Sequence, residues 1–250
     1  MPRIRLRCII EACYHADASE IERRVAHRVT RRVTVWLMNV LVVRHGETPW
    51  NREGRYQGRT DIALSAEGVA QAQRLGQRLA GVTIAHAVAS PLSRARATAE
   101  AIVRARPLEL DDGLLEISHG AWEGQLATDV ERSHAEMFGV WRTAPGRTAP
   151  AGPGAESLGD VEARAWPVLE RLCARLGDGD TGLLVAHDAV NRVLLCRVLG
   201  LPLERVWTFH QAPAALNVLA GPSLAALQVV RLNDSEHSTP LLGASQHRAL

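Results

Sequence analysis

The sequence predicts one α/β domain in which a mostly parallel sheet is covered by helices on both faces. Three observations lead to this expectation: apolar runs of strand length, amphipathic helical segments that alternate with them, and a length of 250 residues, which suits one sizeable core. Hydrophobic residues make up 46% of the chain and charged residues 22%, both ordinary for a globular protein. No apolar run reaches the roughly 18 residues of a membrane span. We therefore expect a soluble protein.

The two ends of the chain differ from its middle. Residues 1–37 are rich in arginine and weakly periodic, so we expect a basic N-terminal extension that is disordered or lies outside the core, with the fold starting near Met38. A translation start downstream of the first methionine is the alternative interpretation. Residues 233–250 are polar and are expected to form a disordered tail. This leaves residues 38–232 as the folded domain.

The first strand is expected over Val40–Val43, a mostly β-branched apolar run that is followed at once by turn residues. Ser65 is suited to cap the helix that comes next. The apolar positions of this helix recur at helical spacing, at Val69, Ala72, Leu75 and Leu79. A second strand over 83–89 and a second helix that opens at Ser90 complete the first half.

The second half continues the alternation of strands and helices. Residues 145–154 are rich in proline and glycine and predict a surface loop. The elements expected after it are a helix over 158–176, a strand over 183–186, a helix over 189–199, and short strands over 216–219 and 224–232. Parallel sheets place ligand sites outside the carboxyl ends of their strands. His45 and His187 both follow a predicted strand and are therefore candidates for such a site.

Charge and residue usage exclude several classes of function. Residues 1–32 hold eight arginines and four acidic residues, so the remainder carries 21 basic and 23 acidic residues and is nearly neutral. A nucleic-acid enzyme usually carries a basic stripe on its folded domain, so we expect a small substrate instead. All 29 basic residues are arginine, which excludes mechanisms that depend on a lysine, such as a Schiff base.

Cysteine usage and the amino-terminal residues bear on metal binding and location. The cysteines show no metal-ligand spacing and are Cys8, Cys13, Cys173 and Cys196. The start of the chain is basic, but its apolar stretch is too short for a signal peptide. We therefore expect a cytoplasmic protein.

The polar residues near the strand ends suit phosphoryl transfer, which needs a nucleophile, positive donors on the phosphate oxygens, and an acid for the leaving oxygen. His45 can be the nucleophile if its other ring nitrogen is held by a hydrogen bond. Arg44 and Arg94 can give planar, always-charged donors to phosphate, and His187 can add another hydrogen bond. Glu116 is the best-placed candidate for the acid.

Ordered blocks in the sequence carry a family resemblance. They are Leu41–Asn51 (LVVRHGETPWN), Gly54–Gly58, Asp61–Ser65, Ser90–Ala95, Glu116 with Gly120–Gly124, and Ala186-His187. Over about residues 39–220 the chain resembles the histidine phosphatase, or phosphoglycerate mutase-like, superfamily. The resemblance implies a three-layer αβα sandwich, a phosphohistidine intermediate on His45, Glu116 as proton donor, and catalysis without metal or other cofactor. It also implies a substrate-binding set made of Arg44, Asn51, Gln57, Arg94 and His187.

Some residues keep a second interpretation. Asn51 could instead cap a local turn and Gln57 could support the loop, while His119 could line the pocket or face solvent. Asp188 departs from the family pattern, in which glycine more often follows the second histidine. A carboxylate at this position could change the polarity of the pocket or the choice of substrate.

The leading hypothesis is a metal-independent hydrolase of a small phosphorylated metabolite. A phosphoglycerate mutase-type phosphotransferase is the alternative, although the stretch between Glu116 and His187 is shorter than the resemblance to such mutases would imply. A catalytically silent module that binds a phospho-ligand is the alternative from another class. We expect a small-molecule phosphate ester as partner, with neither nucleic acid nor membrane, and a homodimer is one open alternative for the oligomeric state.

Overall fold

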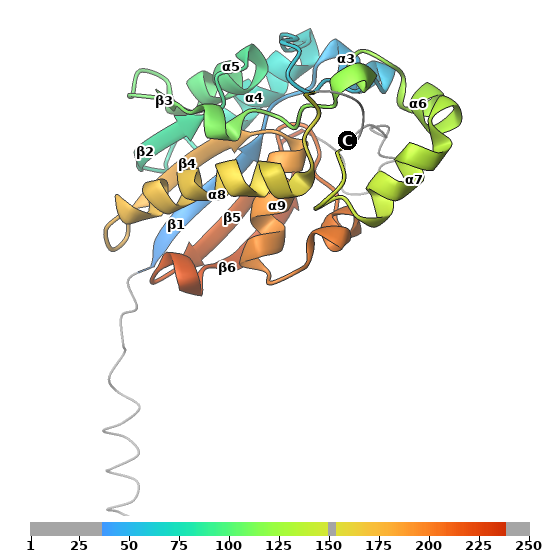
Figure 1. Cartoon of the computed structure of the whole chain (residues 1–250). Coiled ribbons are helices and arrows are strands. Elements are labelled where there is room, and N and C mark those ends of the chain that lie inside the picture. Colours follow the sequence, from blue (N-terminus) through green and yellow to red (C-terminus); the bar gives the residue numbers. More distant parts are fainter. Residues whose placement is uncertain (1–36, 150–153, 239–250) are drawn as a thin grey trace, which may run out of the picture. The chain divides into compact units, whose positions relative to one another are not determined.

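The computed structural model describes residues 37–149 and 154–238. Their central feature is a six-stranded sheet in the order β3-β2-β4-β1-β5-β6, with helices on both faces (Figure 1). The strands are β1 (Met38–Arg44), β2 (Ile84–Ala89), β3 (Glu109–Leu110), β4 (Thr181–Ala186), β5 (Leu216–Gly221) and β6 (Gln228–Asp234). This arrangement confirms the predicted three-layer α/β fold. The predicted extension over 1–37 lies, except for Leu37, outside the described residues.

Strand direction determines where the loops meet. β1 pairs in parallel with β4, β4 with β2, and β2 with β3. β5 is antiparallel to both of its neighbours, β1 and β6, so it alone runs against the other five strands. The carboxyl ends of β1, β2 and β4 therefore lie at one edge of the sheet, which brings His45, Ser90 and His187 together.

The helices form two layers. They are α3 (Pro49–Glu53), α4 (Ala66–Arg78), α5 (Ser93–Val103), α6 (Ala127–Ser133), α7 (Ala135–Thr143), α8 (Leu158–Ala174) and α9 (Asp188–Val198). Short 3-10 turns are η1 (Asp112–Leu114), η2 (Gly120–Trp122), η3 (Leu203–Thr208) and η4 (Leu224–Ala226). Because side chains alternate along β1, Val40 and Val42 join the core under α8 and α9, whereas Leu41 and Val43 join the core under α4 and α5. Both faces of the strand are buried, as its apolar run predicts.

The predicted cap of α4 is confirmed, and its predicted apolar face is confirmed except at Val69. The Ser65 hydroxyl accepts a hydrogen bond from the Gly68 N–H at 3.0 Å and so caps α4. Val69 was expected in the core but its surface is 43% exposed, because the buried stripe of α4 follows Gly68, Ala72 and Leu75 instead. α8 runs through Pro167 without ending.

The predicted tail begins too early. β6 continues to Asp234, whose carboxylate accepts two hydrogen bonds of 2.6 Å from the Arg78 guanidinium on α4. Further on, His237 Nε2 lies 3.0 Å from the Ala214 carbonyl oxygen. The chain from 233 to 238 is therefore tied to the sheet, and only residues 239–250 of the predicted tail fall outside the described part. The strand expected over 224–232 also differs, since its first residues form η4.

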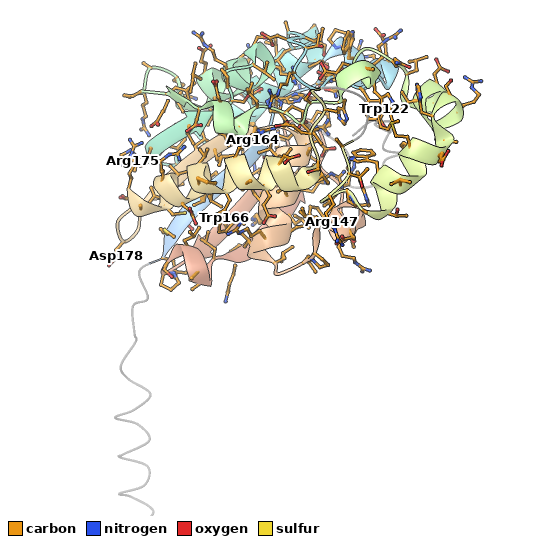
Figure 2. All side chains as sticks on the ribbon, viewed as in Figure 1. Trp122, Arg147, Arg164, Trp166, Arg175 and Asp178 are labelled. Carbon is orange, nitrogen blue, oxygen red and sulfur yellow. The ribbon has the colours of Figure 1, made fainter. Side chains whose placement is uncertain are left out.

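The short helices α6 and α7 were not predicted. They pack around a buried aromatic cluster that includes Tyr56, Trp122 and Trp141, and they lie beyond the strand ends (Figures 1 and 2). The Trp122 and Trp141 rings meet at an interplanar angle of 80° with 5.9 Å between centroids. Edge-to-face contacts of this kind stabilise aromatic pairs. Within the described ranges no helix is long and apolar enough to cross a membrane.

Candidate active site

His45 is held at the end of β1 through its backbone. Its N–H donates to the Ala186 carbonyl at 3.0 Å, and its carbonyl accepts from the Ala214 N–H at 2.9 Å. The ring is buried, and Nδ1 lies 2.7 Å from the Gly46 carbonyl oxygen. Because a carbonyl can only accept, this contact requires a proton on Nδ1, and in the neutral ring the lone pair is then on Nε2. His45 thus has the tautomer that a nucleophile requires.

Gly46 allows the loop after β1 to touch α4 closely. A Cβ atom at Gly46 would lie 2.4 Å from the Gly68 carbonyl oxygen, and one at Gly68 would lie 2.0 Å from the Glu47 carbonyl oxygen. The Gly46 N–H also donates to the Thr98 hydroxyl at 3.1 Å. The backbone next to His45 is therefore packed against two helices with no room for a side chain.

We expect Gly46→Ala to lower the free energy of unfolding by about 1–3 kcal/mol. The new methyl group would clash with a backbone oxygen, which can move away only if helix α4 shifts as well. Urea denaturation measures this change. Gly81→Ala is the matched control, since no atom lies within 4 Å of a Cβ at that position; its effect should stay within about 0.5 kcal/mol. Equal effects of the two substitutions would contradict the close approach.

Arg44 and Arg94 present two buried guanidinium groups to the same space. Arg94 donates to the carbonyl oxygens of Thr60 at 3.0 Å and Gly58 at 2.8 Å. Arg44 donates to the Gln211 carbonyl oxygen. In the part of the chain that the structure describes, the Nε atom of each has no hydrogen-bond partner. Burial lowers the pKa of Arg94 to about 10, so it remains charged at neutral pH. An anion between them would satisfy donors that are costly to leave unpaired.

His187 lies at the N-cap position of α9, directly after β4. Its ring centroid is 5.1 Å from that of His45, and its Nε2 lies 2.8 Å from the Ser90 hydroxyl oxygen. Burial lowers its pKa well below the usual value, and the charge of Arg94 adds to this effect. The ring is therefore neutral at pH 7. If the Ser90 hydroxyl donates to Nε2, the Nδ1–H has no partner within the described residues and can bind a phosphate oxygen.

Glu116 and Asp188 are two buried acids with opposite pKa shifts. Burial raises the pKa of Glu116, and the nearby Asp188 charge raises it further. Burial also opposes ionisation of Asp188, but Arg44, with Nη1 3.8 Å away, and Arg192, with Nε 3.0 Å away, outweigh it and lower the pKa of Asp188. Glu116 therefore keeps its proton to a higher pH than an exposed carboxyl, as a general acid should.

One pocket collects these groups. It holds about 320 Å³ of empty space and is lined by Arg44, His45, Asn51, Arg55, Tyr56, Gln57, Gly58, Arg94, Glu116, His119 and Asp188. All the residues named from the sequence line it except His187, which packs against the His45 ring. Asn51 also forms the capping box of α3 with Thr48, as its second interpretation anticipated. The Gln57 Oε1 atom is buried and, among the described residues, has no partner.

The structure adds residues that the sequence did not assign to the site. Arg55 and Tyr56 line the pocket, and their place inside the Gly54–Gly58 block was the available signal. His119 lines the pocket and is buried, which confirms one of the two interpretations that the sequence left open; burial lowers its pKa to about 3, so its ring is neutral. Asp188 was noted only as a departure from the family pattern.

We expect Asp188→Asn to tighten the binding of inorganic phosphate by roughly threefold to tenfold, because a negative charge next to Arg44 is removed. The same change should lower the pKa of Glu116 and move the alkaline limb of the activity profile to lower pH. Product-inhibition constants and a pH profile measure both effects. Asp178→Asn, in the turn after α8 (Figure 2), is the control. Unchanged phosphate inhibition would contradict the expected role of Asp188.

The chain is similar to proteins of known sequence and structure. The model of the histidine phosphatase superfamily (branch 1) matches residues 40–235. The chain is 35% identical over 185 residues to phosphoserine phosphatase 1 from Hydrogenobacter thermophilus. This match covers 73% of this chain and 86% of that protein. It is 35% identical over 171 residues to the probable phosphoglycerate mutase GpmB from Salmonella choleraesuis. This match covers 66% of this chain and 77% of that protein. A mycobacterial glucosyl-3-phosphoglycerate phosphatase superposes with a TM-score of 0.70 at 26% identity, covering 79% of this chain and 99% of that one.

Proposed function

The chain belongs to the histidine phosphatase superfamily, branch 1, and on this premise we propose that it hydrolyses small phosphomonoesters without a metal, through a phosphohistidine on His45. The observation that carries the proposal is the buried His45 ring, oriented by the Gly46 carbonyl and lying in one pocket with Arg44 and Arg94. An imidazole oriented in this way, beside two anchored guanidinium groups, suits attack on a phosphate dianion.

In the first step, the Nε2 lone pair of His45 attacks phosphorus. The P–N bond forms as the ester P–O bond breaks, and Glu116 gives its proton to the departing oxygen. Arg44, Arg94 and His187 stabilise the charge on the non-bridging oxygens, while the Nδ1–H of His45 stays on the Gly46 carbonyl. The organic alcohol then leaves the pocket.

In the second step, water attacks the phosphohistidine. The Glu116 carboxylate, now deprotonated, takes a proton from this water, the P–N bond breaks, and inorganic phosphate is released. His45 regains its lone pair and Glu116 its proton, so the site returns to its starting state. The raised pKa of Glu116 suits both roles, because it brings the group closer to neutrality as acid and as base.

The relatives support a small substrate. Phosphoserine phosphatase 1 and glucosyl-3-phosphoglycerate phosphatase are named for small phosphorylated metabolites. Two named phosphatases among these relatives favour hydrolysis over the mutase reaction that the name of GpmB suggests.

The test is release of inorganic phosphate from phosphoserine, 3-phosphoglycerate and p-nitrophenyl phosphate in the presence of EDTA, with His45→Ala as the control. Turnover that persists with chelator and disappears in the variant would support the proposal. Isomerisation of 3-phosphoglycerate without phosphate release would favour a mutase. Binding of phosphate without any turnover would favour a catalytically silent binding module.

A further inference from the structure

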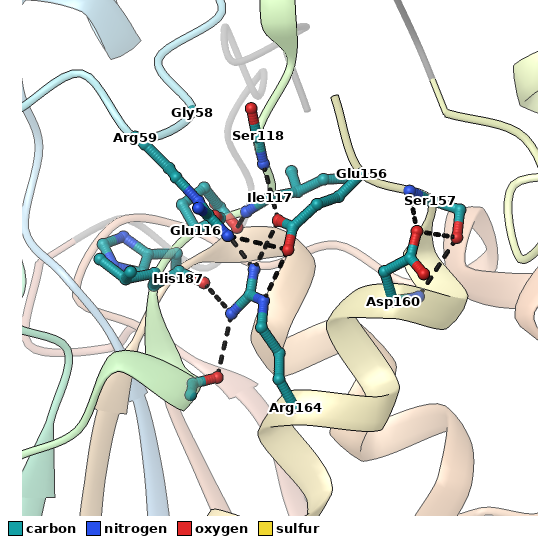
Figure 3. A network of polar contacts seen from close by, with 12 residues as sticks. Gly58, Arg59, Glu116, Ile117, Ser118, Glu156, Ser157, Asp160, Arg164 and His187 are labelled. Carbon is teal, nitrogen blue, oxygen red and sulfur yellow. Dashed lines mark hydrogen bonds and ion pairs between the residues drawn. The ribbon is translucent and has the colours of Figure 1, made fainter. Parts of the chain in front are cut away.

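The Arg164 side chain extends from α8 toward the chain segment that carries Glu116 (Figure 3). Its Nη1 donates to the carbonyl oxygens of Gly113 at 3.0 Å and Leu115 at 2.5 Å, and its Nη2 donates to the Glu116 carbonyl oxygen at 3.1 Å. Its Nε and Nη2 also donate to the Glu156 carboxylate at 3.0 and 2.9 Å. One guanidinium therefore binds three carbonyls at and just before Glu116, and one carboxylate.

Glu156 extends the network to the other side of this segment. Its carboxylate accepts the Ser118 N–H at 3.0 Å, and its own N–H donates to the Ser118 carbonyl at 2.9 Å. The same carboxylate accepts from Arg59 at 2.8 Å. Arg59 stands between Gly58 and Thr60, whose carbonyls anchor Arg94. The network thus connects the segment of the acid with the loop that holds a phosphate-binding arginine.

The Glu116 segment depends on these contacts because it has little regular structure of its own. Residues 115–119, between η1 and η2, form neither helix nor strand. The Glu116 side chain accepts one local hydrogen bond, from the Ile117 N–H at 3.0 Å. Backbone carbonyls that accept no hydrogen bond from a neighbouring strand or a helical turn need donors from elsewhere in the fold. Arg164, on the 17-residue helix α8, supplies donors to two of these carbonyls, those of Leu115 and Glu116, and to that of Gly113 just before them.

We propose that Arg164 and Glu156 are positioning residues, which hold the Glu116 carboxyl where it can give its proton to the leaving oxygen of the substrate. The inference rests on the proposed function, since it takes Glu116 as the acid. Neither residue lines the pocket, so both act through the backbone of the Glu116 segment. A displacement of about 1 Å is enough to slow proton transfer strongly.

Substrates with different leaving groups separate positioning of the acid from general damage. An alkyl phosphate such as phosphoserine releases a strongly basic alkoxide that needs protonation, whereas p-nitrophenyl phosphate releases a stable anion that needs little. Arg164→Met should therefore lower kcat/KM, which reports the step that breaks the ester bond, for phosphoserine or for the best alkyl substrate found by roughly 10- to 100-fold. The kcat/KM for p-nitrophenyl phosphate should change by less than about threefold.

The matched control is Arg171→Met, two turns along α8, because the exposed Arg171 pairs with the Asp111 carboxylate at 2.6 Å rather than with the carbonyls that Arg164 binds. It should leave both rates unchanged. Glu156→Gln keeps acceptors for the Ser118 N–H but loses the charge that holds the two arginines, so it should reproduce the selective loss in weaker form. Arg164→Lys should recover part of the alkyl rate, since an ammonium can still donate to some of the three carbonyls.

The possible results distinguish failure of the hydrolase activity from failure of the positioning role. If the natural protein hydrolyses neither substrate, the proposed function fails. If it is active but Arg164→Met and Glu156→Gln slow both substrates equally, or slow neither, the positioning role is overturned while the hydrolase stands. If Arg164→Met does not fold, Arg164→Lys and Glu156→Gln decide the question, and loss of folding in all three assigns the network to stability alone and overturns the proposal.

Discussion

His45→Ala should lower kcat at least about 10⁴-fold for every phosphomonoester the protein turns over, because loss of a nucleophile removes the covalent route entirely. Binding of inorganic phosphate should survive, since Arg44, Arg94 and His187 come from positions that the substitution leaves in place. The residual rate would come from the two guanidinium groups and the neutral His187 ring, which would stabilise the charge on phosphate during direct attack by water. Steady-state phosphate release measures the loss, and isothermal titration with inorganic phosphate measures the retained binding.

A trapped intermediate gives the second readout for His45. The natural protein mixed with a ³²P-labelled substrate and quenched in alkali should retain label, and acid should remove it, as expected for a P–N bond. His45→Ala should retain none. His86→Ala is the control, because this histidine also lies on a strand of the sheet but contacts Arg175, away from the pocket. Label that persisted in His45→Ala would place the nucleophile elsewhere.

Glu116→Gln should lower kcat/KM, which reports the step that breaks the ester bond, for alkyl phosphates by about 10²- to 10⁴-fold, because an amide matches the shape of the neutral acid but cannot transfer a proton. The loss for p-nitrophenyl phosphate should be smaller, since its leaving group needs little protonation. Glu136→Gln, on an exposed position of α7, is the control. Equal losses for both kinds of substrate would show that Glu116 does not act as the acid.

The pH dependence follows from the direction of the pKa shift. Burial raises the pKa of Glu116 above its ordinary value of 4.5, so the protonated acid persists above that pH. Activity that needs this proton should fall as pH rises through the raised pKa, and the Gln variant should lack that limb.

Stability should follow the same sign. The contribution of the buried, protonated Glu116 to the free energy of unfolding is fully present below the ordinary pKa. It is lost as the pH rises through the raised pKa. The free energy of unfolding of the natural protein should therefore fall relative to that of Glu116→Gln across this window, which urea denaturation at several pH values measures.

The local features of the fold could be read from the sequence because each depends on residues close together in the chain. Val40–Val43 is apolar on both faces and becomes a strand buried on both faces. Ser65 lies three residues before the N–H that it caps. The position of His45 after a strand predicted its place at the sheet edge, and the ordered blocks around it predicted the family that the comparison shows.

Tertiary structure alone decided the features that join distant segments. Arg164 meets the carbonyls of residues 113–116 about fifty positions away, and no spacing in the sequence signals such a contact. The ionised state of Asp188 depends on Arg44 reaching it from another element, and the aromatic cluster that orders α6 and α7 depends on Tyr56. β6 continued past its predicted end because Asp234 meets Arg78 on α4. Local patterns encode hydrogen bonding and burial within an element, whereas distances between elements arise only once the whole core has packed. The sequence by itself therefore determined the elements and the candidate chemical groups, and the packed fold decided which charges face one another and what holds the acid in place.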